Sequence, residues 1–201
     1  MSWTTSSGCT PTLSSPKSCS RSTTLARASH TAKPVALGVD PGTARLGYAL
    51  VAQDGPQPRL LACGVLTTEA EEPAGERLRR LYEGLHALIA QYQPTEVAVE
   101  QLFFNQNVRT AIAVGQARGV VLLVAAQAGL PVCEYTPLQV KLAIVGYGRA
   151  RKEQVQEMVR LLLGLPAPPQ PDDAADAVAI ALCHLQHQQQ RQNWQARGVD
   201  L

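Results

Sequence analysis

The sequence predicts an α/β fold built on a mixed five-stranded sheet with helices on both faces. Of its 201 residues, 45% are hydrophobic, which is enough for one substantial core. Three strand-like apolar runs follow one another at the start of the folded part, and this order favours an antiparallel meander. Further along, helical patterns alternate with single strands, which calls for parallel pairing through right-handed crossovers.

The first three strands are bounded by turn residues. Residues 35–40 are apolar, end in an acid and are followed by a Pro-Gly pair, a pattern typical of a buried strand before a turn. Residues 45–53 and 59–67 are the next two strands, and the Asp-Gly-Pro sequence between them predicts a hairpin-type loop.

The later elements follow from hydrophobic spacing and from helix-ending residues. Apolar positions at helical spacing, stopped by Gly or Pro, predict the helices, and short apolar runs predict the strands. The expected order is a helix over 76–92, a strand over 96–100, a helix over 107–128, a strand over 130–135, and helices that open at 136–137 and cover 151–163 and 172–188.

The chain divides into an N-terminal tail, one domain and a C-terminal tail. Residues 1–33 hold 16 Ser or Thr, four basic residues and no acid, with almost nothing large and apolar, so a disordered extension is predicted. A transit peptide, or a start codon placed too far upstream, would give the same composition. Residues 34–188 are expected to form the functional domain, and the Gln-rich residues 189–201 a flexible tail.

Charge and cysteine content exclude some classes of function. Beyond residue 33 the chain carries 14 basic and 16 acidic groups, so any nucleic-acid contact must use a local patch. The five cysteines are scattered and form no CxxC pair, so neither a zinc ribbon nor a disulfide framework is indicated, and the reducing cytoplasm fits best. No segment has the pattern of a membrane span.

Four carboxylates stand out by their positions. Asp40 and Glu100 each close an apolar strand, and Asp173 and Asp176 lie three apart at the start of the last helix, on one face. Each has an ordinary alternative, as a turn former, a salt-bridged strand end, or a helix-capping acid. Together they predict a site for hard divalent cations, because carboxylate oxygens are the preferred ligands of such ions.

Five segments resemble the RuvC family of Holliday-junction endonucleases, which belongs to the ribonuclease H-like superfamily. The resemblance runs from about residue 35 to residue 187. The matching segments appear in the family's order as LGVDPGTARLGYAL, VAVEQLFFNQN, GQARGVV, EYTPLQVKLAIVGYGRARKEQV and LPAPPQPDDAADAVAIALCH.

The resemblance implies a nuclease domain whose catalytic acids and metal ligands are Asp40, Glu100, Asp173 and Asp176, with Asp172 as an alternative to Asp173. It implies two Mg²⁺ or Mn²⁺ ions per active site, in an enzyme of recombination and repair that nicks two opposed strands of a Holliday junction. The implied partners are four-way junction DNA, a second copy of the chain, and the branch-migration proteins RuvA and RuvB.

DNA contacts are expected on two segments. The resemblance assigns base stacking to Phe103 in the loop after Glu100, where Phe104 and Asn105 are further candidates, although adjacent aromatics also often pack into a core. A basic stretch predicts salt-sensitive phosphate contacts. The alternative is a solvated helix face with intrahelical ion pairs, such as one between Arg149 and Glu153. The candidates in and near this stretch are Lys141, Arg149, Arg151 and Lys152, with Arg109 as a weaker one.

Three further interpretations stay open. Arg118 is either a weak DNA contact or an internal ion-pair partner. Gly115 and Gly119 in the long helix permit close packing, either on the sheet or across the dimer seam that the resemblance implies. His184 and His187 are interpreted as surface or helix-end residues rather than ligands.

Two other functions compete with a nuclease. The Asp-Pro-Gly-Thr turn is similar to the phosphate-binding turn of sugar kinases and actin-like ATPases. The chain is too short for their two duplicated domains and shows no second Gly-rich phosphate loop. A non-catalytic junction-binding protein is the other alternative, and the intact acids at all four positions argue against it.

Overall fold

The computed structural model describes residues 33–101 and 108–198 and contains the predicted mixed sheet. Five strands lie in the order β3-β2-β1-β4-β5. In chain order the elements are β1 (Val35–Asp40), β2 (Arg45–Asp54), β3 (Gln57–Thr67), α1 (Ala74–Tyr92), β4 (Glu96–Glu100), α2 (Val108–Gln127), β5 (Val132–Tyr135), α3 (Pro137–Val145), α4 (Lys152–Leu162) and α5 (Asp172–Ala196).

Strand pairing places β1 at the centre of the sheet. β1 pairs antiparallel with β2, and β2 pairs antiparallel with β3, as the predicted meander requires. β1 also pairs parallel with β4, and β4 pairs parallel with β5. The carboxyl ends of β1 and β4 therefore meet at the same edge of the sheet, and the predicted fold class is confirmed.

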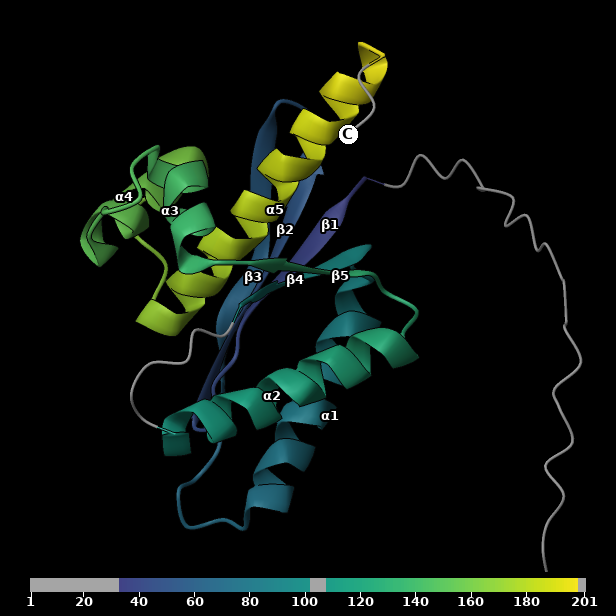
Figure 1. The fold of residues 1–201 in the computed structure, drawn as a ribbon, viewed down its shortest axis with the longest axis vertical. Coiled ribbons are helices and arrows are strands. Elements are labelled where there is room, and N and C mark those ends of the chain that lie inside the picture. The colour runs from purple at the N-terminus through teal and green to yellow at the C-terminus, as the bar shows by residue number, and fades with distance from the viewer. Residues whose placement is uncertain (1–32, 102–107, 199–201) are drawn as a thin grey trace, which may run out of the picture. The chain divides into compact units, whose positions relative to one another are not determined.

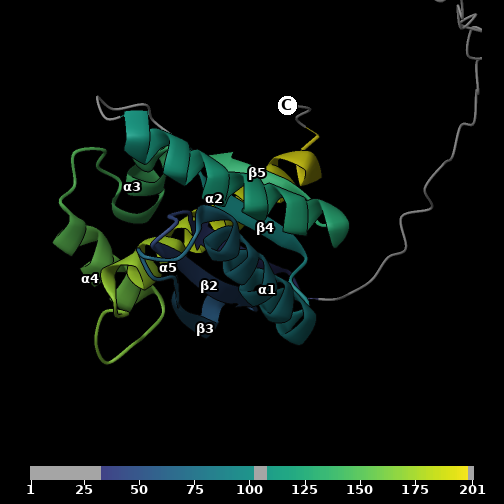
Figure 2. The same cartoon turned by 90° about the horizontal axis from the view of Figure 1, so that it is seen from below.

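Helices cover both faces of the sheet (Figures 1 and 2). On one face, Leu81 of α1 and Val121 of α2 pack against alternate strand residues such as Leu37. On the other face, α5 lies directly on the strands through small side chains such as Ala177 and Ala181. Alternation along each strand thus supplies one core to α1 and α2 and another to α5.

The ends of several helices and strands differ by a few residues from those expected, and the largest difference is at α5. This helix continues to Ala196, so residues 189–196 are helical and the predicted helix end at residue 188 was wrong. Gln, Arg and Ala favour helix, and neither Gly nor Pro occurs between Asp172 and Gly198. Within the described ranges, no helix is long and apolar enough to cross a bilayer.

Candidate active site

The predicted acids meet at the carboxyl edge of the central strands. Asp40 is the last residue of β1 and Glu100 is the last residue of β4. Each directly follows one member of the pair Val39 and Val99, which face each other in the parallel ladder. Asp176 lies near the start of α5, which packs across this edge (Figure 1). Parallel pairing of two strands that each end in an acid therefore places these carboxylates side by side.

Burial, followed by repulsion from neighbouring carboxylates, raises the pKa values of the two strand acids. The pKa of Asp40 is raised to about 6, mainly by burial and then by the charges of Asp176 and Asp173. The pKa of Glu100 is raised to about 7, by burial first and then by Asp40 and Asp176. Half-buried carboxylates that raise each other's pKa values are stabilised by a bound cation, and oxygen ligands suit hard divalent ions. The donor set thus fits the predicted metal site.

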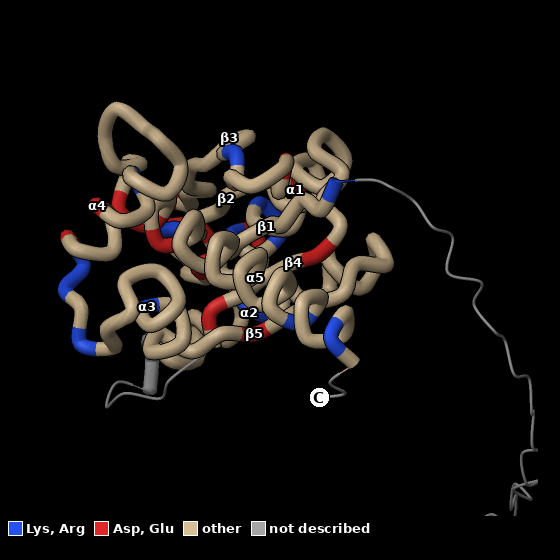
Figure 3. Tube along the Cα trace, turned by 90° about the horizontal axis from the view of Figure 1, so that it is seen from above, with Lys and Arg blue, Asp and Glu red and all other residues tan. Residues whose placement is uncertain are grey.

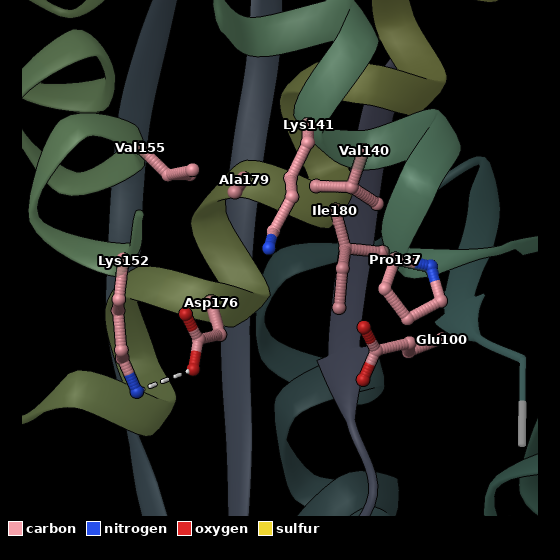
Figure 4. A pocket seen from close by; sticks show the side chains of 9 residues that line it. All are labelled: Glu100, Pro137, Val140, Lys141, Lys152, Val155, Asp176, Ala179 and Ile180. Atoms are coloured by element: carbon pink, nitrogen blue, oxygen red, sulfur yellow. Dashed lines mark ion pairs between the residues drawn. The ribbon is translucent and has the colours of Figure 1, made fainter. Parts of the chain in front are cut away.

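Two lysines supply positive charge to the same pocket (Figure 4). Lys152 Nζ lies 2.9 Å from Asp176 Oδ2 and 3.4 Å from Asp172 Oδ2. Lys141 lines the pocket from α3, and its charge lowers the pKa of Glu100. The pocket therefore combines carboxylates with ammonium groups, a pairing suited to a metal ion and a phosphate.

The alternatives Asp172 and Asp173 occupy different surroundings. The negative charge of Asp173 helps to raise the pKa of Asp40. Its Oδ2 accepts a hydrogen bond of 2.6 Å from Arg45 Nε. Asp172 is more exposed and accepts a hydrogen bond of 3.0 Å from the Gln156 side chain on α4. This geometry favours Asp173 as the fourth acid of the cluster.

Arg45 is a site residue that the sequence alone did not identify. It opens β2, and its guanidinium reaches the start of α5, 128 residues further along the chain. Its only sequence signal is a basic residue at the start of a strand, which is common at a solvated edge. Arg45 orients Asp173 and offsets part of its charge.

The predicted DNA contacts are distributed over the pocket and the segments beside it. Arg149 and Arg151 are exposed in the segment between α3 and α4, which is basic in Figure 3. Since α4 begins at Lys152, Arg149 and Glu153 do not share a helix, so the intrahelical alternative was wrong. Phe103, Phe104, Asn105 and the side chain of Arg109 lie outside the described residues.

Two other candidate side chains make contacts within the chain. Arg118 forms an ion pair with Glu134, so its internal alternative is confirmed. His184 was expected at the surface, but it is 1% exposed and its Nδ1 lies 2.9 Å from the Tyr135 hydroxyl. The surface expectation was wrong because α5 lies flat on the sheet and turns this residue toward β5. His187 is half-buried and stacks on the Tyr135 ring.

Comparison with known proteins gives a family whose acids and topology agree with this site. Residues 36–184 match the family model described as crossover junction endodeoxyribonuclease RuvC. The chain is 62% identical over 148 residues to the RuvC of Roseiflexus sp. (strain RS-1), covering 74% of this chain and 88% of the relative. It is 60% identical over 148 residues to the RuvC of Desulfitobacterium hafniense (strain DSM 10664 / DCB-2), covering 74% of this chain and 90% of the relative.

Solved structures agree with this assignment. The chain is similar to T. thermophilus RuvC in complex with a Holliday junction substrate, with a TM-score of 0.74, 44% identity, and coverage of 77% of this chain and 94% of that one. The yeast mitochondrial Holliday junction resolvase shares the fold at a TM-score of 0.58 and 15% identity, covering 81% and 83%. The chain belongs to the RuvC family of crossover junction endodeoxyribonucleases.

Proposed function

We propose that this protein resolves Holliday junctions by nicking two opposed strands in a divalent-metal-dependent reaction. The observation that carries the proposal is the carboxylate cluster at the joined ends of β1 and β4, in a chain of the RuvC family. As an enzyme acting on recombining DNA, it is expected to work in the cytoplasm, with the branch-migration proteins RuvA and RuvB as partners.

The four acids Asp40, Glu100, Asp173 and Asp176 would hold two Mg²⁺ or Mn²⁺ ions. When bound, such ions activate a water and stabilise the leaving oxygen of a phosphodiester. Positively charged side chains of the protein lie beside these acids. Lys141 and Lys152 face the pocket from α3 and α4 and can bind the phosphates on either side of the scissile bond.

A synthetic four-way junction tests the proposal directly, with a linear duplex of the same sequence as control. Paired nicks at symmetric positions, seen only with the junction and only with Mg²⁺ or Mn²⁺, are the expected result. Tight junction binding without cleavage under either metal would favour a non-catalytic junction-binding protein. Nucleotide binding without junction preference would favour the ATPase-like alternative.

Metal use is expected to depend on pH. The raised pKa values of Asp40 and Glu100, about 6 and about 7, mean that both acids gain protons as the pH falls from 8 to 6. Protons then compete with the metal, so the Mg²⁺ concentration giving half-maximal cleavage should rise at pH 6, and excess Mg²⁺ should restore activity. Magnesium titrations of junction cleavage at pH 6 and pH 8 measure this. A metal requirement unchanged between the two would contradict it.

We further propose that two copies pair through the outer face of α2. Ile112 and Leu123 are 57% and 52% exposed, and Gly119 lies on the same face with open space at its Cβ position. Ala117 and Val121 point the other way, into the core against the sheet. Exposed apolar side chains around a glycine suit close approach of a second helix across a two-fold axis.

Leu123→Glu is expected to convert the dimer to a monomer, because it places a charge in an apolar seam. Sedimentation velocity measures the change of oligomeric state. In the junction cleavage assay, paired nicks should give way to single nicks. Leu161→Glu is the matched control, since Leu161 is 55% exposed on α4, away from α2. Dimers that persist in Leu123→Glu would exclude this face.

A further inference from the structure

A second cluster of ligand-type side chains lies on the α5 face of the sheet, away from the acids. Glu96 begins β4, Cys133 lies in β5 and His184 lies in α5, and one ligand atom from each lies within 4.8 Å of the others. Glu96 and Glu100 are four residues apart on one strand, which is a distance of about 13 Å. The cluster is therefore distinct from the nuclease centre.

Topology explains why these three residues meet. Ala98 pairs with Cys133 in the parallel ladder, so Glu96 and Cys133 project diagonally on the face that α5 covers. α5 starts at the catalytic edge and runs back across the sheet. His184 is eight residues after Asp176, which is about 12 Å along the helix axis. The helix therefore reaches the opposite end of β4 at His184.

His184 presents its ring nitrogen Nε2 to this cluster. The side chain is 1% exposed, and among the described residues Nε2 is buried without a hydrogen bond. Glu96 Oε2 lies 2.9 Å from Nε2, within ion-pair distance. With Nε2 deprotonated, its lone pair, the Glu96 carboxylate and the Cys133 thiol would together be satisfied by one cation.

Neighbouring side chains hold two of the ligands in position. The Tyr135 hydroxyl, 2.9 Å from His184 Nδ1, can accept the Nδ1 proton and so leave the Nε2 lone pair directed at the cluster. The Gln188 amide donates to Glu96 Oε1, which leaves Oε2 available. Supporting contacts of this kind orient the ligands in protein metal sites.

We propose that Glu96, Cys133 and His184 form a zinc site at the end of the sheet away from the nuclease centre. Sulfur, imidazole nitrogen and carboxylate oxygen together suit Zn²⁺ and not Mg²⁺, with water as a fourth ligand. Binding forms a zinc–sulfur bond, and the thiol proton leaves to solvent. The ion joins β4, β5 and α5 beside the Tyr135–His184 and Gln188–Glu96 contacts. It thereby stabilises α5, the helix that holds Asp173 and Asp176.

Cobalt binding to the full-length, chelator-treated protein tests the proposal. With excess Mg²⁺ present to occupy the acids, Co²⁺ is expected to give a thiolate-to-cobalt charge-transfer band at one ion per chain, and Zn²⁺ should remove the band. Cys133→Ser should abolish it, and Glu96→Gln should weaken cobalt binding by about tenfold or more. Circular dichroism confirms that each variant is folded.

Two matched variants locate the ion. Cys63→Ser replaces another half-buried thiol, on β3, and Asp40→Asn removes a catalytic acid, so both should keep the cobalt band. Absence of a thiolate band in the parent protein would overturn the proposal. So would a band that survives in Cys133→Ser, because it would place the metal on a different cysteine.

Discussion

Asp40→Asn and Asp176→Asn are each expected to abolish junction cleavage while leaving junction binding intact. The substitution keeps the size of the side chain and removes the negative charge that a divalent cation needs. Losing about 4 kcal/mol of transition-state stabilisation corresponds to roughly a thousandfold in rate. Cleavage rates and gel-shift binding on the same four-way junction measure the two effects separately. Full cleavage by either variant would refute the assigned site.

The same substitution at Asp40 is expected to stabilise the metal-free protein. Because the pKa of Asp40 is raised from 3.8 to about 6, its ionisation opposes folding increasingly between these pH values and fully above pH 6. Asn carries no charge, so the free energy of unfolding in EDTA at pH 8 should rise by up to about 3 kcal/mol. Urea unfolding of both proteins at pH 8 and pH 5 tests this, and the gain should shrink at pH 5. If Asp40→Asn is inactive but more stable, its loss of activity cannot come from unfolding, so Asp40 has a catalytic role.

Asp172→Asn provides a control with the same change of charge. Asp172 is exposed and bonded to Gln156, and it is not among the groups that raise the pKa of Asp40. Near-normal cleavage by Asp172→Asn, together with loss of cleavage in Asp173→Asn, is the expected outcome. The reverse result would reassign the fourth ligand to Asp172.

The sheet could be predicted because its strands are short, apolar and separated by turn residues. β1 and β4 were expected with their observed ends, since each run closes in an acid followed by a break in the pattern. The meeting of Asp40 with Glu100 then follows from parallel pairing, which the alternation of helices and strands favours. The proximity of Asp40 and Glu100 could therefore be predicted from the order of elements.

Features that depend on how α5 crosses the sheet could not be predicted in this way. The contact of Arg45 with Asp173 and the burial of His184 both require the helix to lie at one height and rotation on the strands. Sequence spacing shows which residues share a helical face but not which strand position they meet. The same reason applies to the Glu96, Cys133 and His184 cluster, whose members come from three elements.

Gly38→Ala is expected to destabilise the protein by about 3 kcal/mol, because α5 lies against β1 at this position. A Cβ at Gly38 would be 2.2 Å from the Ala177 carbonyl oxygen and 2.8 Å from the Ala181 Cβ, where ordinary contacts are 3.4–4 Å. Helix backbone cannot move aside as a flexible side chain would, so α5 must shift as a unit. Urea unfolding measures the loss.

Gly75→Ala is the opposite control, since nothing lies within 4 Å of its Cβ position at the start of α1. Alanine there should stabilise the protein by about 0.5 kcal/mol, because it restricts the unfolded chain. Gly38→Ala should also lower cleavage, because a shifted α5 carries Asp173 and Asp176 away from Asp40. Equal stability of Gly38→Ala and the parent would mean that α5 does not lie on β1 here. The close approach at Gly38 would thus hold Asp173 and Asp176 of α5 beside Asp40 of β1, across most of the length of the folded chain.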